Sequence, residues 1–155
     1  MPVRKLKEFL DNKNIKYVTV FHSQAYTAQE VAESAHIPGK ELAKTVMVKI
    51  DGKMVMAVLS ASDKVDLDSL KDAVGASKVD LASEQEFEDL FPGCEIGAMP
   101  PFGNLYEMQV FVEENLSEDT EIAFNAGSYT ELIRLSYKDF ERLVKPTVVK
   151  FSSNS

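Results

Sequence analysis

The sequence predicts a single mixed α/β (α+β) domain in which helices flank a mixed β-sheet. Three observations support this fold class. The chain has 155 residues, which is the usual length of one domain. Its composition, 45% hydrophobic and 27% charged, is ordinary for a globular protein. Helical and strand patterns follow one another in irregular order, which excludes the regular alternation of a doubly wound parallel sheet.

The N-terminal quarter predicts a helix, a strand and a second helix. Apolar residues three and four positions apart indicate a helix over residues 3–13. Residues 17–21 are rich in β-branched and aromatic side chains and predict a strand. Thr27 begins the sequence Thr-Ala-Gln-Glu, a capping-box pattern, so a helix is expected from there to about His36.

A β-hairpin is the strongest local prediction. Residues 43–50 and 53–60 are apolar, β-branched runs joined by Asp51-Gly52. Asp-Gly favours a two-residue type I′ turn, which joins antiparallel strands. Both strands are apolar on both faces, as is typical of central strands in a covered sheet.

The second half of the chain predicts a mixture of short elements. Capping and periodicity indicate helices over 66–74, 83–91 and 137–144, and strands over 108–112, 121–125, 131–135 and 147–151. Residues 92–106 are rich in glycine and proline and predict a structured loop. We expect one domain over residues 1–151 and a mobile tail over 152–155.

Composition excludes several classes of function. The net charge is −8, which argues against broad nonspecific nucleic-acid binding. Residues 1–77 hold 11 basic and 10 acidic residues, and residues 78–155 hold 6 and 15, so a polyanion is expected to contact the first half. Cys94 is the one cysteine, which excludes an internal disulfide, and with two histidines we expect no metal and no cofactor.

Membrane and targeting signals are also missing from the sequence. No apolar run approaches the roughly 18 residues of a membrane span, and the N-terminus has no signal-peptide core. We therefore expect a cytoplasmic protein that does not contact a membrane.

Three local features could carry chemistry. Strand alternation puts Lys44 on one face with three β-branched apolar residues, either at the mouth of a pocket or with its ammonium in solvent at the strand's end. The segment Gly97–Gly103 reads Gly-Ala-Met-Pro-Pro-Phe-Gly, which suits either a clamp for a small ligand or a stiff connector. The segment Asn125–Tyr129 reads Asn-Ala-Gly-Ser-Tyr, either an ordinary turn or the rim of a site.

These features occur together in one family. The sequence resembles the YbaK/EbsC family, related to the editing domain of prolyl-tRNA synthetase, over about residues 3–145. The resemblance rests on Tyr26–Ala32, Leu42–Val48, Gly97–Gly103, and Asn125–Ser128 followed by Thr130–Ile133. It implies a compact α/β domain around a mixed, partly closed sheet. The implied activity is hydrolysis, in trans, of the ester between a wrong small amino acid (alanine, cysteine or serine) and tRNA, with tRNA-Pro as the expected tRNA.

The resemblance also implies roles for single residues. Lys44 matches the family's lysine near the terminal adenosine and its phosphate, and Gly97 begins the loop that supplies backbone contacts, so these two are the candidate catalytic residues. The candidate substrate-binding residues are His22, Thr27, Thr45, Met99, Pro100, Pro101, Phe102, Gly103, Asn125, Gly127, Ser128 and Tyr129. The expected partners are the acceptor end of aminoacyl-tRNA and a prolyl-tRNA synthetase.

One departure from the family pattern keeps other functions open. Many relatives carry His where this chain has Tyr129, and a tyrosine cannot act as a base near neutral pH without a large pKa shift. A binding module that has lost turnover is therefore the alternative function. A hydrolase of another small ester, without RNA, is a third hypothesis, which the acidic second half supports. The oligomeric state is left open.

Overall fold

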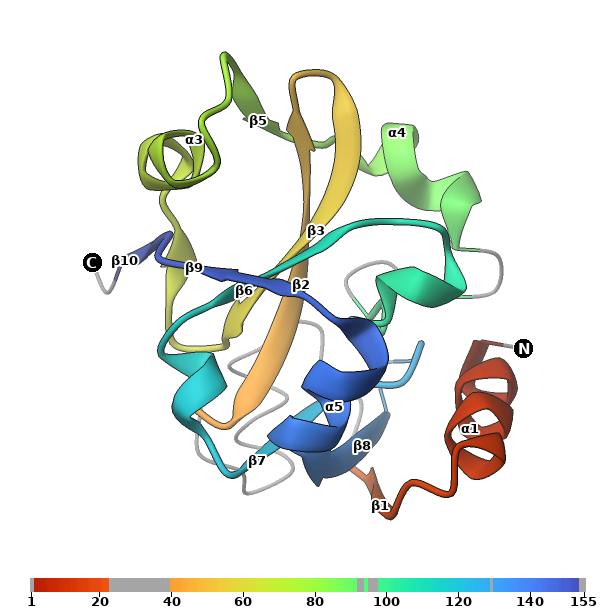
Figure 1. Cartoon of the computed structure of the whole chain (residues 1–155). Coiled ribbons are helices and arrows are strands. Elements are labelled where there is room, and N and C mark those ends of the chain that lie inside the picture. Colours follow the sequence, from red (N-terminus) through yellow and green to blue (C-terminus); the bar gives the residue numbers. More distant parts are fainter. Residues whose placement is uncertain (1, 23–39, 92–93, 95–97, 129, 154–155) are drawn as a thin grey trace.

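The protein folds around a twisted eight-stranded sheet with helices on both faces (Figure 1). The computed structural model describes residues 2–22, 40–91, 94, 98–128 and 130–153. The predicted helix between Thr27 and His36 lies outside the described residues. The mixed sheet and flanking helices confirm the fold class predicted from the sequence.

The sheet mixes antiparallel and parallel neighbours. Its strand order is β1-β8-β7-β2-β3-β6-β9, and β5 pairs with β2 beside this path. The pairs β2–β7, β3–β6 and β6–β9 are parallel, and the other described pairs are antiparallel. The strands are β1 (Tyr17–Phe21), β2 (Leu42–Ile50), β3 (Lys53–Ser60), β5 (Val79–Leu81), β6 (Val110–Glu113), β7 (Glu121–Asn125), β8 (Glu131–Ser136) and β9 (Thr147–Val149).

The β2–β3 hairpin is central, as predicted. Asp51 and Gly52 both have positive φ, 51° and 81°, which is the type I′ geometry that Asp-Gly favours. Ile50 pairs with Lys53, and the register continues to Ala43 opposite Ser60. β7 and β6 cover the two outer edges of this hairpin.

Two hydrophobic cores lie on the two faces of the sheet. The main core contains apolar side chains from α1 (Pro2–Asn12), α4 (Glu84–Phe87) and α5 (Tyr137–Val144). The second core lies under α3 (Leu67–Val74), whose Leu70 is fully buried with Val48 and Leu59 of the hairpin. Ser83 and Ser136 cap α4 and α5, and Asp66 caps α3, so three of the predicted helix starts are confirmed.

Several boundaries differ from the prediction. β6 begins at Val110 rather than 108, because the Met108 amide donates to the Gly103 carbonyl at 2.8 Å and so belongs to a turn. The segment predicted as one helix over 83–91 is α4 followed by a 3-10 turn over Glu88–Leu90. The model adds 3-10 turns at Gly103–Leu105 and Leu116–Glu118.

The C-terminal segment is held more firmly than the sequence indicates. β9 ends at Val149, and the Phe151 amide donates to the buried carboxylate of Glu113 at 2.7 Å instead of extending the strand. Ser152–Ser153 then form β10, which pairs with β4 (Lys64–Val65). These two residues were expected to belong to a mobile tail, and their pairing is a tertiary contact that local sequence does not reveal.

Candidate active site

Lys44 projects from the central hairpin toward the second core. The alternation predicted from the sequence is confirmed, since Val48 belongs to that core and Val46 and Ile50 pack against it. Lys44 pairs in register with Leu59, another member of the core. The Lys44 side chain is half-buried and makes no hydrogen bond or ion pair with any described residue. Its ammonium is therefore partly dehydrated.

The electrostatic surroundings of Lys44 are dominated by its burial. Desolvation lowers the pKa of Lys44, the nearby carboxylate of Asp63 opposes this shift, and Lys64 adds to it. Asp63 is buried and fixed in place: its Oδ2 accepts hydrogen bonds from Asn115 Nδ2 at 2.8 Å and from Ser152 Oγ at 3.3 Å. Asp63 thus places a negative charge near the Lys44 ammonium, while its Oδ2 already accepts hydrogen bonds from Asn115 and Ser152.

Asn125 lies next to Lys44 across the parallel β2–β7 pair. Ala43 pairs with Phe124, and both belong to the main core. The following residues on the two strands are Lys44 and Asn125, whose side chains point to the opposite face because successive side chains alternate. Asn125 is only 9% exposed, and its Oδ1 has no hydrogen-bond partner among the described residues. An unsatisfied buried carbonyl costs about 1–3 kcal/mol, so Asn125 offers an acceptor that no donor among the described residues satisfies.

The turn after β7 gathers further candidate residues at the same end of the sheet. Gly127 is buried with φ of 105°, a conformation that favours glycine. Ser128 Oγ accepts from the Thr130 amide at 3.4 Å, which tightens the turn. The His22 amide donates to the Thr130 carbonyl at 3.0 Å, so His22, at the end of β1, lies against this turn.

The proline-rich loop is anchored in the main core. Pro100 and Pro101 are buried, and Met99 and Phe102 belong to the core itself. The Phe102 ring lies 5.4 Å from Phe124 and 5.5 Å from Phe140, measured between ring centres. Burial of this kind favours an anchoring role for Phe102 over the substrate contact predicted from the sequence.

Gly103 ends the loop at a close backbone approach. A Cβ on Gly103 would lie 2.4 Å from the Met108 carbonyl oxygen and 2.6 Å from Val110 Cγ2, so only glycine fits. This close approach folds the loop back onto β6, and a role of Gly103 in contacting substrate stays a prediction.

Not all candidates share one face. Thr45 alternates with Lys44 and points to the main-core side, like its neighbours Ala43 and Met47. Thr27, Gly97 and Tyr129 lie outside the described residues. Sequence reasoning missed Asp63 and Asn115, because the turn after β3 brings Asp63 near Lys44 and a 3-10 segment brings Asn115 to Asp63, and no spacing in the sequence links them.

A polar hollow of about 430 Å³ opens beside Asp63. It is lined by Lys40, Ser60, Ser62, Asp63, Asn115, Glu118 and Asp119. Burial, with help from nearby Glu41, raises the pKa of Asp119. Among the residues the model describes, no group of three His, Cys, Asp or Glu side chains could hold a metal ion. Burial also raises the pKa of the Cys94 thiol, which makes it a poor nucleophile.

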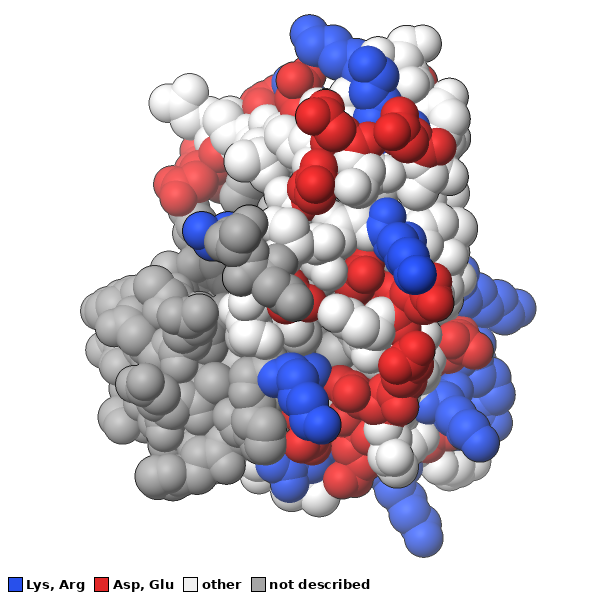
Figure 2. All heavy atoms as spheres, turned by 90° about the vertical axis from the view of Figure 1, so that its left-hand side faces the viewer, with Lys and Arg blue, Asp and Glu red and all other residues white. Residues whose placement is uncertain are grey.

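Charge on the neighbouring surface is mixed and mostly acidic. Figure 2 shows the side of the molecule that carries α3, where Asp and Glu side chains form a band with Lys and Arg between them. No helix in the described part of the chain is both long and apolar enough to cross a membrane.

Comparison with known proteins identifies the family. The model of the aminoacyl-tRNA editing domain matches residues 22–143, and the chain belongs to this family. The family and editing function that the sequence motifs predict are thereby confirmed.

Curated relatives align over most of the chain. The multifunctional Ser/Thr-tRNA deacylase ProXp-y of Escherichia coli strain K12 is 29% identical over 153 residues, covering 96% of this chain and 91% of the relative. The prolyl-tRNA editing protein ProX of Acetoanaerobium sticklandii is 29% identical over 143 residues, covering 88% and 86%. A proline–tRNA ligase of Bacillus mycoides matches over 85 residues at 28% identity, covering 55% of this chain and 15% of the ligase.

Solved structures share the fold. A crystal structure described as a candidate trans-editing enzyme for prolyl tRNA synthetase superposes with a TM-score of 0.82 at 20% identity, covering 98% of this chain and 97% of the other. A hypothetical protein superposes with a TM-score of 0.85 at 19% identity, covering 96% and 99%.

Proposed function

We propose that this chain is a trans-acting aminoacyl-tRNA deacylase that hydrolyses the ester of a small, wrongly attached amino acid, with tRNA-Pro as its tRNA. The observation that carries the proposal is the pair formed by Lys44 and Asn125, an ammonium and an amide oxygen that are both dehydrated and without described partners. Family membership supplies the reaction, and this pair supplies the means of holding its substrate.

The two side chains suit the two charged ends of an aminoacyl-adenosine. The Lys44 ammonium would hold the phosphate of the terminal nucleotide or the oxyanion that develops at the ester carbonyl. Asn125 Oδ1 would accept a hydrogen bond from the α-amino group of the amino acid. Both interactions exchange water for a fixed protein group, which strengthens them at a half-buried site.

The reaction needs only modest catalysis because an aminoacyl ester is already activated. Water forms a bond to the ester carbonyl carbon, the bond from that carbon to the ribose oxygen breaks, and the ribose oxygen takes up a proton. The products are the free amino acid and uncharged tRNA. The Gly97 amide is the candidate oxyanion donor by resemblance, and a neighbouring ribose hydroxyl of the substrate is the candidate proton carrier.

Alanine, cysteine and serine remain the proposed amino acids. The buried, proline-stiffened loop over residues 98–103 suits discrimination by size, where one methylene is worth about 1–3 kcal/mol. The relative named as a Ser/Thr-tRNA deacylase favours serine and adds threonine to the test. The relative named as a prolyl-tRNA editing protein supports tRNA-Pro.

Association with a prolyl-tRNA synthetase, in the cytoplasm, is a second part of the proposal. It is supported by the match to a segment of a proline–tRNA ligase. Such a partner would supply tRNA affinity that a protein with a net charge of −8 lacks.

The test is deacylation by the purified protein of tRNA-Pro charged with alanine, cysteine, serine or threonine, beside correctly charged tRNA-Pro. We expect selective hydrolysis of at least one mischarged ester and its loss in Lys44→Ala. Lys53→Ala is the matched control, because Lys53 is exposed, carries the same charge and lies at the far end of the hairpin.

Two outcomes would contradict the proposal. If the folded wild-type protein binds charged tRNA without turnover on any of the four esters, the chain is a binding module. If it hydrolyses a small ester equally well with and without the tRNA body, RNA is not part of its substrate.

A further inference from the structure

A second pocket lies away from Lys44, where the C-terminal ends of α1 and α5 meet. Its volume is about 490 Å³, and it is lined by Phe9, Lys13, Asn104, Arg142, Leu143 and Lys145. Asn104 directly follows the candidate active-site loop, and the Lys5 ammonium on α1 donates to the Leu105 carbonyl at 2.9 Å. The pocket and the loop therefore share one stretch of backbone.

The lining is cationic on an acidic protein. Three of its six residues carry positive charge, Asn104 adds an amide donor, and no Asp or Glu lines it. Lys13 and Lys145 are exposed and form no ion pair with any described residue. Arg142 is paired with Asp139 at 3.0 Å, but its side chain is 66% exposed, so the guanidinium keeps free donors.

The pocket differs from the rest of the surface in charge. The second half of the chain holds 6 basic against 15 acidic residues, yet it supplies two of the three cations here. On α5, Lys138 and Arg142 are four residues apart, so they lie along one face of the helix, and Lys145 is the residue that ends it. α1 lies on the right of Figure 1. Figure 2 views the molecule from the left-hand side of Figure 1, so α1 is on the side that faces away from the viewer of that acidic face.

The apolar residues of the pocket are part of the packed interior. Phe9 and Leu143 pack against the main core, and the Phe9 ring meets Phe102 edge-on at 6.2 Å between centres. The core therefore holds the apolar part of the lining in place, beneath the exposed cations.

Helix ends provide the competing explanation. Cations after the last turn of α1 and α5 favour the negative ends of the helix dipoles. Those ends are already partly satisfied by backbone, since the Lys13 amide donates to Phe9 and the Lys145 amide to Glu141. Helix stabilisation does not require both cations and an arginine to line one pocket.

We propose that this pocket binds backbone phosphates of RNA and is a docking site for the tRNA body, separate from the site that holds its acceptor end. The inference rests on the proposed function for the identity of the RNA. The pocket is then the part of the surface that gives an acidic protein affinity for a polyanion.

The test compares two double variants of the full chain. Lys13→Gln with Lys145→Gln removes two cations from the pocket, and Lys53→Gln with Lys71→Gln removes two exposed, unpaired lysines elsewhere. Each double variant changes the net charge from −8 to −10, so the two variants have the same net charge and differ only in where the cations were removed. The readout is affinity for uncharged tRNA over a series of salt concentrations.

For the pocket variant we expect roughly tenfold weaker tRNA binding than for the wild type. The slope of log binding constant against log salt concentration should be shallower by about 1.5, and the control variant should match the wild type in both. Hydrolysis of an aminoacylated oligonucleotide that contains only the single-stranded acceptor end should be the same in all three proteins. Thermal unfolding checks the fold, and Lys13→Gln alone serves if the double variant unfolds.

The outcomes separate this inference from the proposed function. If the wild type hydrolyses mischarged tRNA and both double variants bind tRNA alike, docking at the pocket is overturned and the function stands. If the wild type hydrolyses no ester but its tRNA affinity depends on the pocket, docking stands and the function fails. If inorganic phosphate binds the pocket while tRNA affinity is alike in both variants, the pocket is a small-anion site and RNA docking is overturned.

Discussion

Lys44 occupies a position where its charge works against folding. Burial lowers the pKa of Lys44, so its ammonium is less favourable in the folded protein than in the unfolded chain at every pH below that lowered pKa. The penalty is relieved only as the pH rises and the amine loses its proton. A residue that lowers stability and has no described partner is typical of a binding or catalytic position.

Replacing Lys44 by methionine should therefore separate stability from activity. At pH 7 we expect Lys44→Met to unfold in urea at the same or a higher midpoint than the wild type, because the dehydrated charge is gone. Deacylation should be lost. A clear drop in the unfolding midpoint would show that Lys44 stabilises the fold instead.

Gly103, in contrast to Lys44, favours the folded state, because its lack of a side chain allows the close backbone packing at this position. A methyl group there would overlap the Met108 carbonyl and Val110. We expect Gly103→Ala to lower the free energy of unfolding by about 1–3 kcal/mol, measured by urea denaturation. The neighbouring Asn104→Ala is the control, because Asn104 is exposed and its loss should leave the midpoint nearly unchanged.

Sequence alone identified single residues only where a local rule applied. Strand alternation put Lys44 on the correct face, opposite to Thr45. The electrostatic effect of Asp63 on Lys44 followed no such rule, because it depends on how the turn after β3 folds back. Phe102, predicted to bind substrate, has its ring in the main core, and the sequence could not show this because aromatic residues in a glycine-proline loop can face either way.

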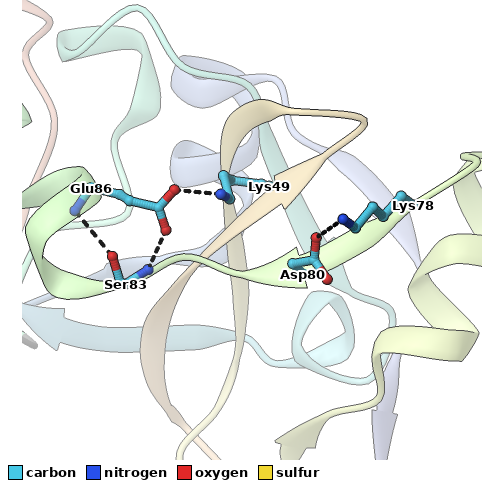
Figure 3. Close-up of polar contacts among 5 residues, drawn as sticks. All are labelled: Lys49, Lys78, Asp80, Ser83 and Glu86. Atoms are coloured by element: carbon cyan, nitrogen blue, oxygen red, sulfur yellow. Dashed lines mark hydrogen bonds and ion pairs between the residues drawn. The ribbon is translucent and has the colours of Figure 1, made fainter.

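At the scale of elements, α4 is tied to the central hairpin by one carboxylate. Glu86 completes the capping box by accepting from the Ser83 amide at 2.8 Å, and it pairs with Lys49 of β2 (Figure 3). The Lys49 hydrogen bond is the main cause that lowers the pKa of Glu86 to about 2, followed by the Ser83 amide. Both partners favour the ionised form.

This arrangement predicts a stability difference that depends on pH. Because the folded-state pKa of Glu86 lies below its ordinary value of 4.5, its stabilisation is complete above that value and is lost as the pH falls toward 2. Glu86→Gln should be less stable than the wild type at pH 7, and the two should converge between pH 4.5 and 2. Denaturation curves that stay equally separated over this range would contradict the prediction.

Elements defined by local rules were predictable, and elements defined by pairing were not. Asp51-Gly52 determines the hairpin, and Ser83 and Ser136 mark helix starts by their own side chains. β5 and β10 are short strands that exist because they meet β2 and β4. Their residues carry no alternation long enough to be recognised in the sequence.

At the scale of the whole molecule, Phe151 closes the second core. Its side chain is 1% exposed among residues of the hairpin, α3 and β6. We expect Phe151→Ala to lower the free energy of unfolding by about 3–5 kcal/mol, measured by denaturant titration. Ser153→Ala, two residues further along the chain, should change it by less than about 0.5 kcal/mol. Equal effects of the two changes would contradict this account of the C-terminal segment.

The parallel pairing of β2 with β7 has a consequence for how the protein is made. It joins residues 42–43 to residues 123–124, so Lys44 and Asn125 become neighbours only after a long loop closes. Such distant contacts form late and slowly compared with the local β2–β3 hairpin. A chain still emerging from the ribosome therefore carries its lysine long before the asparagine arrives beside it, and a newly synthesised protein gains this candidate site only near the end of folding.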